Sequence, residues 1–289
     1  MKQPALPLNL QIIMLLLSCV FFTAPATVQG AETQHQSEAA KSYAIGIGAE
    51  LVQGDYGVNA NARLFTMPLT LMLYPGMDLD ISVELPLLVA SSSTGSTMLV
   101  TQSGGSGRRW WSTTTSTTTT TVATETTTTE AGLGDINLTA GWIMLHEREL
   151  LPELRPYVYL KLPTGSDQRG LGTGTYEVGP GLSVPKWIDD LHLFADSAYI
   201  FQNSTDLYAG KNYLNFSGGL GFQLTDRLYT AALFKGATTK AEGGDMAREV
   251  RLKLSATQSR KVTWDFYLLK GLSDASPDFG GGLQAVYSF

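Results

Sequence analysis

The chain alternates apolar and polar residues along most of its length, and this two-residue period constrains its fold more than any other feature. Between Ser42 and Leu51, for example, Tyr43, Ile45 and Ile47 share one face, and small or polar residues lie between them. Successive side chains of a β-strand point to opposite faces, so this period indicates strands with one apolar face. The chain is therefore expected to be all-β.

The apolar face is predicted to contact lipid. Arg251 and Lys253 alternate with Leu252 and Leu254, and a cation that faces lipid at the bilayer midplane costs ~2–4 kcal/mol. The charged face must therefore point inward, whereas a soluble chain would leave a continuous apolar surface uncovered. After residue 30, no apolar stretch approaches the ~20 residues that a spanning helix needs. These patterns predict a transmembrane antiparallel up-and-down β-barrel.

About 12 strands are predicted, each near the ~9–11 residues that a tilted spanning strand needs. Short connections such as 74–77 and 225–226 alternate with longer ones such as 164–172 and 203–211. Bacterial outer-membrane barrels have even strand numbers and alternate short periplasmic turns with long external loops in this way. The connection 146–155 is longer than a periplasmic turn should be.

Some strand boundaries follow from single residues. One strand is expected to open at Gly132 and another at Thr173. Pro68 and Pro180 lie inside predicted strands, and proline lacks the N–H that a ladder requires. A bulge or a strand end is therefore predicted at each proline.

The two ends of the chain indicate the cell outer membrane of a Gram-negative bacterium. Lys2, the apolar run 12–22 and the small residues that follow it have the pattern of a secretory signal peptide, expected over residues 1–30. A polar periplasmic tail is expected over 31–41, and the barrel over 42–289. Phe289 resembles the final aromatic residue of outer-membrane barrels, and this resemblance implies recognition by the barrel-assembly machinery.

The single cysteine lies within the expected signal peptide. Leu16-Leu17-Ser18-Cys19 resembles a lipoprotein cleavage box, but the apolar run continues past Cys19, which disfavours that alternative. If the peptide is removed whole, the mature chain has no thiol for a disulfide, a nucleophile or a metal ligand.

Residues 91–130 form a Ser-, Thr- and Gly-rich external insertion. Threonine favours strands, so an extended hairpin above the barrel is expected. The cluster from Arg108 to Trp111 lies in the middle of this insertion. It could contact lipopolysaccharide phosphates or a ligand, although an interfacial aromatic anchor with snorkelling arginines is the favoured interpretation.

Strand parity predicts which residues line the lumen. The predicted pore-lining residues are Glu50, Asn59, Arg63, Asp80, Glu84, Asp135, Lys161, Glu177, Asp196, Arg251, Lys253 and Asp265. Rings of charge and the lumen width would then set selectivity. The segment from Arg227 to Gly236 has no clean polar face, and Tyr229, Ala231 and Leu233 could line an apolar part of the interior.

Four short motifs resemble those of one known family: Gly132 to Asp135 (GLGD), Leu160 to Gly165 (LKLPTG), Gly170 to Gly174 (GLGTG) and Ser276 to Gly280 (SPDFG). In order and spacing they resemble the outer-membrane transporter family associated with the meta-pathway of phenol degradation, over most of the chain from about Gly132 onward. The resemblance implies a barrel that passes small, aromatic or otherwise hydrophobic compounds through the outer membrane. It brings no catalytic or binding residues with it, and the Thr-rich insertion departs from the family pattern.

An enzyme is not expected. The chain has three histidines, His35, His146 and His192, and no Gly-x-Ser-x-Gly elbow. Asp196 lies on the same strand face as His192, but four residues along a strand span ~13 Å, too far for a hydrogen-bonded dyad. Both His146 and His192 are interpreted as solvated turn histidines near the periplasmic rim.

Binding partners other than solute and lipid are also not expected. No cluster of His, Cys and carboxylate residues has the spacing of a metal site, and no cofactor is predicted. The net charge of −6 argues against nucleic acid, which needs a basic footprint. The predicted partners are outer-membrane lipid, lipopolysaccharide, the assembly machinery and a small-molecule solute.

Two main functions remain. The first is a channel for passive uptake of small solutes. The alternative is a closed structural or surface-binding barrel that acts through its Thr-rich external loop, because twelve strands can leave a lumen filled by side chains. A barrel phospholipase, which would depend on His192, is a more distant third.

Overall fold

Strands make up the regular structure of the chain in the computed structural model. The structure describes residues 42–55, 62–92, 96–103, 116–123, 128–205, 209–241 and 244–289. None of these residues belongs to a helix long and apolar enough to cross a membrane. The expected signal peptide, the tail and the cluster from Arg108 to Trp111 lie outside the described residues.

The strands follow one another along the chain with short or moderate connections. Their bounds are β1 (Ser42–Gly54), β2 (Ala62–Tyr74), β3 (Leu79–Ser92), β4 (Ser96–Ser103), β5 (Ser116–Ala123), β6 (Thr128–Leu133), β7 (Ile136–Trp142), β8 (Arg155–Leu162), β9 (Glu177–Ile188), β10 (Leu191–Gln202), β11 (Tyr213–Thr225), β12 (Leu228–Ala237), β13 (Ala247–Ser259), β14 (Val262–Gly271) and β15 (Phe279–Ser288).

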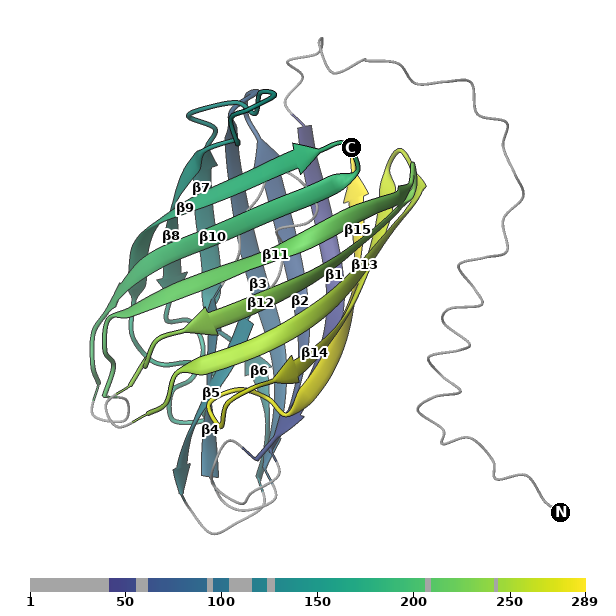
Figure 1. The fold of residues 1–289 in the computed structure, drawn as a ribbon. Coiled ribbons are helices and arrows are strands. Elements are labelled where there is room, and N and C mark those ends of the chain that lie inside the picture. The colour runs from purple at the N-terminus through teal and green to yellow at the C-terminus, as the bar shows by residue number, and fades with distance from the viewer. Residues whose placement is uncertain are drawn as a thin grey trace, which may run out of the picture. The chain divides into compact units, whose positions relative to one another are not determined.

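All strands except β4 and β5 form one antiparallel sheet that closes on itself (Figure 1). The last strand, β15, returns to β1 and pairs with it from Ala44 opposite Ser288 to Gln53 opposite Phe279. β6 and β7 both pair with β3 and together supply one strand of the wall. The wall therefore has twelve strands, and the predicted barrel is confirmed.

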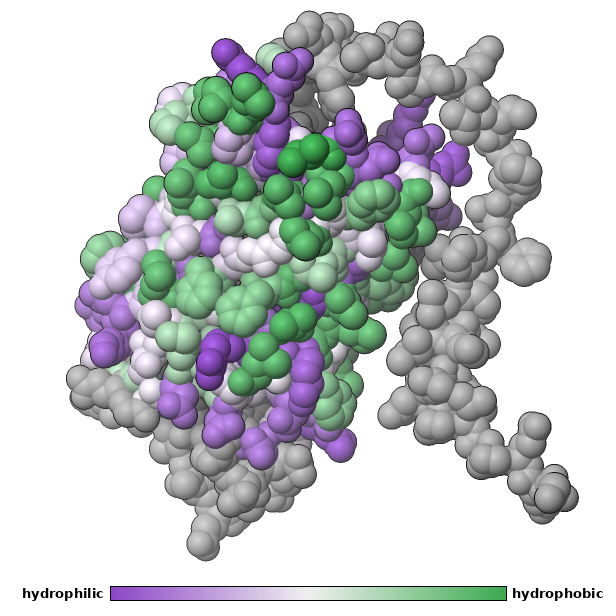
Figure 2. Space-filling view, in the orientation of Figure 1, coloured by the Kyte–Doolittle hydropathy of each residue, from purple (hydrophilic) through white to green (hydrophobic). Residues whose placement is uncertain are grey.

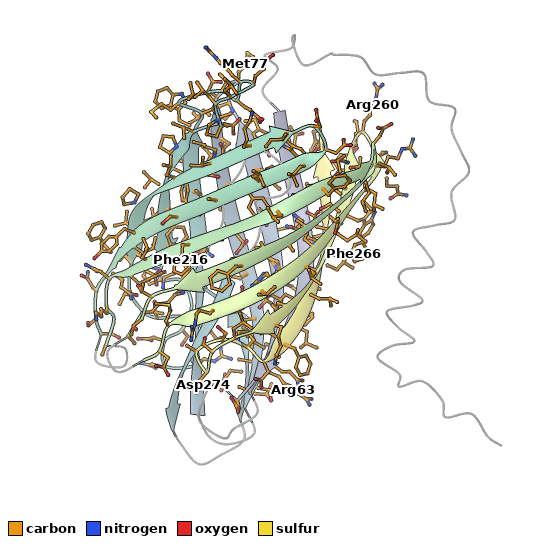
Figure 3. All side chains as sticks on the ribbon, in the orientation of Figure 1. Arg63, Met77, Phe216, Arg260, Phe266 and Asp274 are labelled. Atoms are coloured by element: carbon orange, nitrogen blue, oxygen red, sulfur yellow. The ribbon has the colours of Figure 1, made fainter. Side chains whose placement is uncertain are left out.

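The two ends of the barrel differ in the length of their connections. The short-turn end carries connections 75–78, 143–154, 189–190, 226–227 and 260–261. At the long-loop end, more residues separate consecutive strands, and the connections 163–176 and 272–278 are described throughout. In Figure 3, Met77 and Arg260 lie at the short-turn end, and Arg63 and Asp274 lie at the long-loop end. The predicted alternation is confirmed, with 143–154 as the long exception.

The outer wall is apolar. Large exposed side chains such as Ile47, Leu69, Leu220, Leu252 and Leu268 alternate with buried positions along their strands. Figure 2 shows hydrophobic residues gathered over the middle of the wall and hydrophilic ones toward both ends. So large an apolar surface would be unfavourable in water and suits contact with lipid tails.

The Ser- and Thr-rich residues extend the sheet and add a separate hairpin. β4 and β5 pair with each other as a two-stranded sheet. Ser92 at the end of β3 pairs with Thr128 at the start of β6. The strand expected to open at Gly132 therefore begins four residues earlier, because β3 is long enough to pair with those additional residues.

The prediction of a bulge or strand end at Pro68 and Pro180 is wrong. β2 keeps one register with β1 on both sides of Pro68, and β9 keeps one register with β10 on both sides of Pro180. Two consecutive pairs drop out of each ladder, namely the pair that contains the proline and the pair next to it, because proline has no N–H to donate. Gly48 leaves room at one of these gaps, since a Cβ there would lie 3.1 Å from Pro68 Cγ.

An arginine on the outer wall should destabilise the barrel. Leu252 lies near the middle of β13 and is 59% exposed. We expect Leu252→Arg to lower the free energy of unfolding by ~2–4 kcal/mol if position 252 lies near the bilayer midplane. Denaturant unfolding in lipid vesicles measures this change. The control is Gln168→Arg, which changes a residue of an exposed connection. Equal free energies of unfolding for the two variants would contradict a lipid-facing wall.

Candidate functional site

The Gly-Leu-Gly-Asp motif forms a β-bulge where β6 meets β7. Three residues, Gly134, Asp135 and Ile136, stand opposite two residues of β3, Leu85 and Pro86. A bulge leaves one residue unpaired and re-aims the side chains beside it. As a result, Gly134 and Asp135 are both buried although they are adjacent in sequence, and the carboxylate points into the barrel.

Asp135 fastens the connection between β8 and β9 to the wall. Its carboxylate accepts hydrogen bonds from the backbone N–H of Gly165 at 3.0 Å and of Thr173 at 3.1 Å. The strand predicted to open at Thr173 instead begins at Glu177. The prediction was wrong because Thr173 and its neighbours, which have strand-like composition, are held by the carboxylate of Asp135 across the mouth.

Thr164 secures the start of the same connection. Its hydroxyl donates to the carbonyl oxygen of Gly134 at 2.8 Å and accepts from the N–H of Ile136 at 3.0 Å. These two bonds satisfy backbone groups beside the bulge, where the regular ladder is interrupted. Three motifs that are separate in the sequence therefore meet at one place.

Lys161, the penultimate residue of β8, completes this arrangement. Its Nζ donates to Thr173 Oγ1 at 2.5 Å, lies 3.4 Å from Asp135 Oδ2 and forms an ion pair with Glu177. Glu177 also accepts a hydrogen bond from the hydroxyl of Tyr213 at 2.8 Å. Lys161 and Glu177 are 0% exposed, so these bonds are charge-assisted and desolvated. We call Asp135, Lys161, Thr173 and Glu177 the latch.

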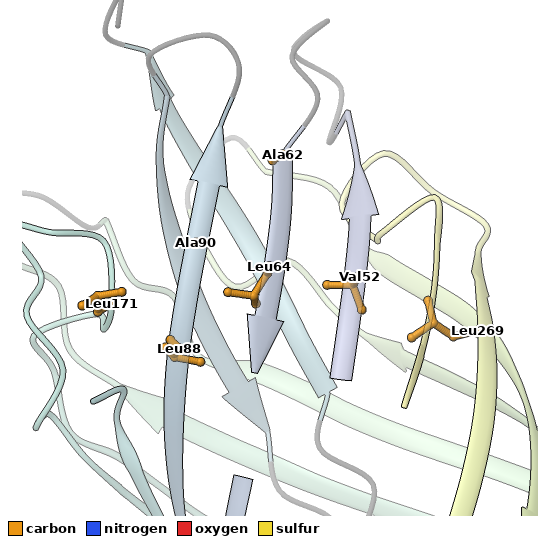
Figure 4. Close-up of a cluster of buried hydrophobic side chains, with 7 residues drawn as sticks. All are labelled: Val52, Ala62, Leu64, Leu88, Ala90, Leu171 and Leu269. Atoms are coloured by element: carbon orange, nitrogen blue, oxygen red, sulfur yellow. The ribbon is translucent and has the colours of Figure 1, made fainter. Parts of the chain in front are cut away.

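The latched connection carries Leu171 into an apolar cluster near the long-loop end of the lumen. Gly132 leaves space for it, because a Cβ at that position would lie 2.9 Å from Leu171 Cδ1. We call the cluster the collar, and Figure 4 shows its members: Val52, Ala62, Leu64, Leu88, Ala90, Leu171 and Leu269. Six of them come from wall strands, and Leu171 alone comes from a connection.

A further cation lies at this end of the barrel. Lys240, in the connection 238–246, places its Nζ 4.7 Å from the centroid of the Tyr213 ring. Burial lowers the pKa of Lys240 to about 8, although the nearby carboxylate of Glu177 opposes this shift. The charge of Lys240 is therefore lost as the pH rises through about 8.

Away from the mouth, charged and phenolic side chains occupy the lumen. Arg155 donates through Nε to Asp80 Oδ1 at 2.8 Å and forms an ion pair with the same carboxylate. Tyr157 donates its hydroxyl to Asp196 at 2.7 Å. Arg155 is 2% and Asp80 3% exposed, so water does not screen this pair.

A second group of charges lies on β13 and β14. Arg251 donates through Nε to Glu249 at 2.7 Å, and its guanidinium carbon lies 4.9 Å from the centroid of the Tyr267 ring. Lys253 Nζ lies 3.5 Å from Asp265 Oδ2. Opposite charges thus neutralise one another within the barrel, which offsets the cost of burying them.

Tyrosine rings lie over glycines of neighbouring strands. Tyr157 pairs directly with Gly181, and Tyr267 pairs directly with Gly282. A Cβ at Gly181 would lie 2.2 Å from the Tyr157 ring, and one at Gly282 would lie 2.5 Å from the Tyr267 ring. Only glycine admits a ring in this position, so these rings lie along the wall.

The structure brings most of the predicted pore-lining residues to the inner face. Glu84 and Asp196 are half-buried there. The buried ones are Glu50, Asp80, Asp135, Lys161, Glu177, Arg251, Lys253 and Asp265. Asn59 lies outside the described residues. Whether the placed residues line a conducting pore stays a prediction.

Arg63 is the predicted residue that the structure puts elsewhere. It is exposed, whereas its neighbours Ala62 and Leu64 are buried. The collar takes Ala62 and Leu64 inward, so the alternation of β2 sends Arg63 to the outer face. Its place at the long-loop end lets the guanidinium reach water instead of lipid (Figure 3).

Parity reasoning also missed residues that face the lumen. Arg155 has the same facing as Lys161 on β8, and this signal was available in the sequence. Lys235 was missed because the other residues on its face of β12 are mostly apolar. Of these, Tyr229, Ala231 and Leu233 are buried as expected. The partner of each charge could not be predicted, because partners lie on other strands.

His192 is not the solvated turn histidine that was predicted. It is buried, its Nδ1 lies 2.8 Å from Tyr229 Oη, and its ring stacks on Trp187 with centroids 4.4 Å apart. His192 pairs directly with Trp187 across the β9–β10 hairpin, and the Trp187 ring covers the imidazole. His146 is exposed at the short-turn end, with Nε2 3.0 Å from Asp78 Oδ1.

Metal ligands are not grouped among the described residues. No set of three or more His, Cys, Asp and Glu side chains in this part of the chain could hold a metal ion. The carboxylates there lie instead beside cations, hydroxyls and backbone N–H groups, as Asp80 and Asp135 illustrate.

The buried ion pair between Asp80 and Arg155 should matter more than the exposed pair nearby. We expect Asp80→Ala to lower the free energy of unfolding by about 3–5 kcal/mol, because the buried guanidinium loses its carboxylate. Asp78→Ala removes the exposed partner of His146 and should cost at most about 1 kcal/mol. Denaturant unfolding in vesicles measures the free energy of unfolding of both variants. Equal decreases in the two variants would contradict a desolvated pair between Asp80 and Arg155.

Comparisons with known proteins agree with this architecture. An outer membrane channel from Pseudomonas putida F1 superposes with a TM-score of 0.62 at 13% identity, over 90% of this chain and 100% of that one. The KdgM porin gives a TM-score of 0.51 at 9% identity, over 85% and 99%. Identities this low show a shared fold alone.

Sequence comparison goes further than these structures do. No curated protein matches the sequence significantly. A family model does match, and it covers residues 52–289, which include the latch and the collar. The chain belongs to the family described as "Putative MetA-pathway of phenol degradation".

Proposed function

We propose that this chain is a channel of the bacterial outer membrane that passes small solutes by passive diffusion, aromatic or otherwise hydrophobic compounds among them. Its family, its barrel fold and its apolar outer wall support this proposal. The solved protein from Pseudomonas putida F1 that shares the fold is an outer membrane channel. The proposal includes no catalytic step.

The collar is the observation that carries the proposal. An apolar ring such as phenol loses water favourably against Leu64, Leu88 and Leu171, at about 25 cal/mol per Å² of apolar surface. Beyond the collar, the inner wall presents paired charges and phenols, such as Arg155 with Asp80. An apolar solute binds this polar surface weakly, and a channel needs sites that a solute can both enter and leave.

The competing function is a closed barrel whose lumen serves only stability. Its support is the burial of the paired charges, among which Lys161 and Glu177 are 0% exposed. A closed barrel would conduct no ions and would pass no solute. Permeation therefore separates the two functions directly.

The purified barrel should make liposomes permeable. We expect swelling with a small sugar such as arabinose to exceed swelling with a tetrasaccharide, because a twelve-strand barrel is narrower than the 16–18-strand porins that enclose wide aqueous channels. Conductance steps in planar bilayers provide a second readout. No swelling with any solute and no conductance would exclude the channel and leave the closed barrel.

Polar substitution in the collar should reduce the preference for apolar solutes. We expect Leu64→Ser to slow phenol entry into vesicles relative to arabinose entry, because apolar contact with the solute is lost. The matched control is Thr70→Ser, which also faces the lumen from β2 but lies outside the collar. An unchanged phenol-to-arabinose ratio in Leu64→Ser would contradict a role of the collar in selecting solutes.

A further inference from the structure

We propose that the latch sets the width of the channel mouth by holding Leu171 in the collar. The inference rests on the proposed channel function and adds the residues that limit passage. In the closed arrangement, Leu171 narrows the lumen beside Leu64 and Leu88. When Asp135 releases the connection between β8 and β9, Leu171 leaves the collar and the mouth widens.

The connection itself is divided into an outer and an inner part. Gln168 and Arg169 are exposed, whereas all residues from Gly170 to Thr173 are buried. Gly170 adopts a φ of 69°, a left-handed conformation that suits glycine. The chain therefore turns inward at Gly170, and Leu171 is the one large apolar side chain that this turn delivers.

The bonds that hold the inner part depend on the backbone of the connection. Asp135 accepts from the N–H groups of Gly165 and Thr173, which lie on either side of Leu171. A single carboxylate thus fixes both arms of the turn. Lys161 fixes the carboxylate in its place, since its Nζ lies 3.4 Å from Asp135 Oδ2.

Two glycines allow this close approach. A Cβ at Gly172 would lie 2.3 Å from Asp135 Oδ1, and a Cβ at Gly165 would lie 2.3 Å from the carbonyl oxygen of Leu171. Neither distance is compatible with a side chain. The glycines of the two motifs therefore have a common explanation, because each lets the connection lie against the carboxylate or against itself.

An outer attachment also exists, and it is weaker. Arg169 donates through Nε to Glu130 at 2.7 Å and through a terminal nitrogen to the carbonyl oxygen of Ala131 at 2.8 Å. The side chains of Arg169 and Glu130 are 51% and 36% exposed, so salt and water screen this pair. Release of the connection is therefore governed by the buried latch.

The width inference is tested by single-channel conductance in planar bilayers. We expect Leu171→Ala to raise the conductance of the open level at least about two-fold, because pore size at a constriction governs conduction. The control Gln168→Ala changes an exposed residue of the same connection and should conduct like the wild type. If the wild type conducts and Leu171→Ala has the same conductance, the proposed role of Leu171 is wrong.

The latch is tested with Asp135→Asn and Gly172→Ala. The first weakens the hydrogen-bond acceptor, and the second displaces the connection while leaving every charge in place. The current through each variant should switch between two conductance levels, the lower level of the wild type and the higher level of Leu171→Ala. Steady currents at the wild-type level from both variants would overturn the latch. The same switching in both variants would exclude a simple effect of charge, because Gly172→Ala changes no charge.

Trypsin gives a readout that does not need conduction. A released connection exposes the bond after Arg169, so Asp135→Asn and Gly172→Ala should be cut there faster than the wild type or Gln168→Ala. Heat-modifiable migration on gels confirms that each variant is folded. Faster cleavage of both variants, with a wild type that never conducts, would show that the latch holds the connection but would refute the channel and a role in its width. Unchanged cleavage in both variants would refute the latch.

Discussion

The pairing of β15 with β1 is the constraint on which the rest of this structure depends. Lipid offers no hydrogen-bond partners, so every backbone N–H and C=O in the wall must be paired within the sheet. The ladder from Ala44–Ser288 to Gln53–Phe279 removes the last free edge. Once the wall is closed, each strand has one face toward lipid and one toward the lumen. The places of charges, tyrosines and glycines follow from that division.

Inside the closed wall, side chains must satisfy one another. Arg155 with Asp80 and Lys161 with Glu177 are pairs whose members lie on different strands. Breaking one of these pairs costs far more than breaking a surface pair, because the remaining charge stays desolvated. The polar interior is therefore specific in its geometry. The same specificity holds the β8–β9 connection and with it the place of Leu171 in the collar.

Much of this fold could be predicted from alternation alone, because the apolar and polar residues of a single strand show which of its faces contacts lipid. The twelve strands, the alternation of connections and the facing of Glu50 or Lys253 depend on local sequence. Arg63 was misassigned because the nearby alternation has no strongly apolar side, and only the collar decides it. Thr173 was assigned to a strand from its local sequence alone. Its hydrogen bond to Asp135 joins residues far apart in the sequence, so local sequence could not show it. The prolines were misjudged because each strand keeps its register although two ladder pairs are lost beside the proline.

The β-bulge at Gly134 and Asp135 has a consequence for how the chain can vary in length. One residue beyond the regular count separates the facing of β6 from that of β7. Deletion of Ile136 would restore a regular ladder and keep the closed wall, yet it would place Asp135 opposite Leu85 and turn its carboxylate toward the outer face. The number of residues between two strands is thus as strict a requirement here as their chemical identity.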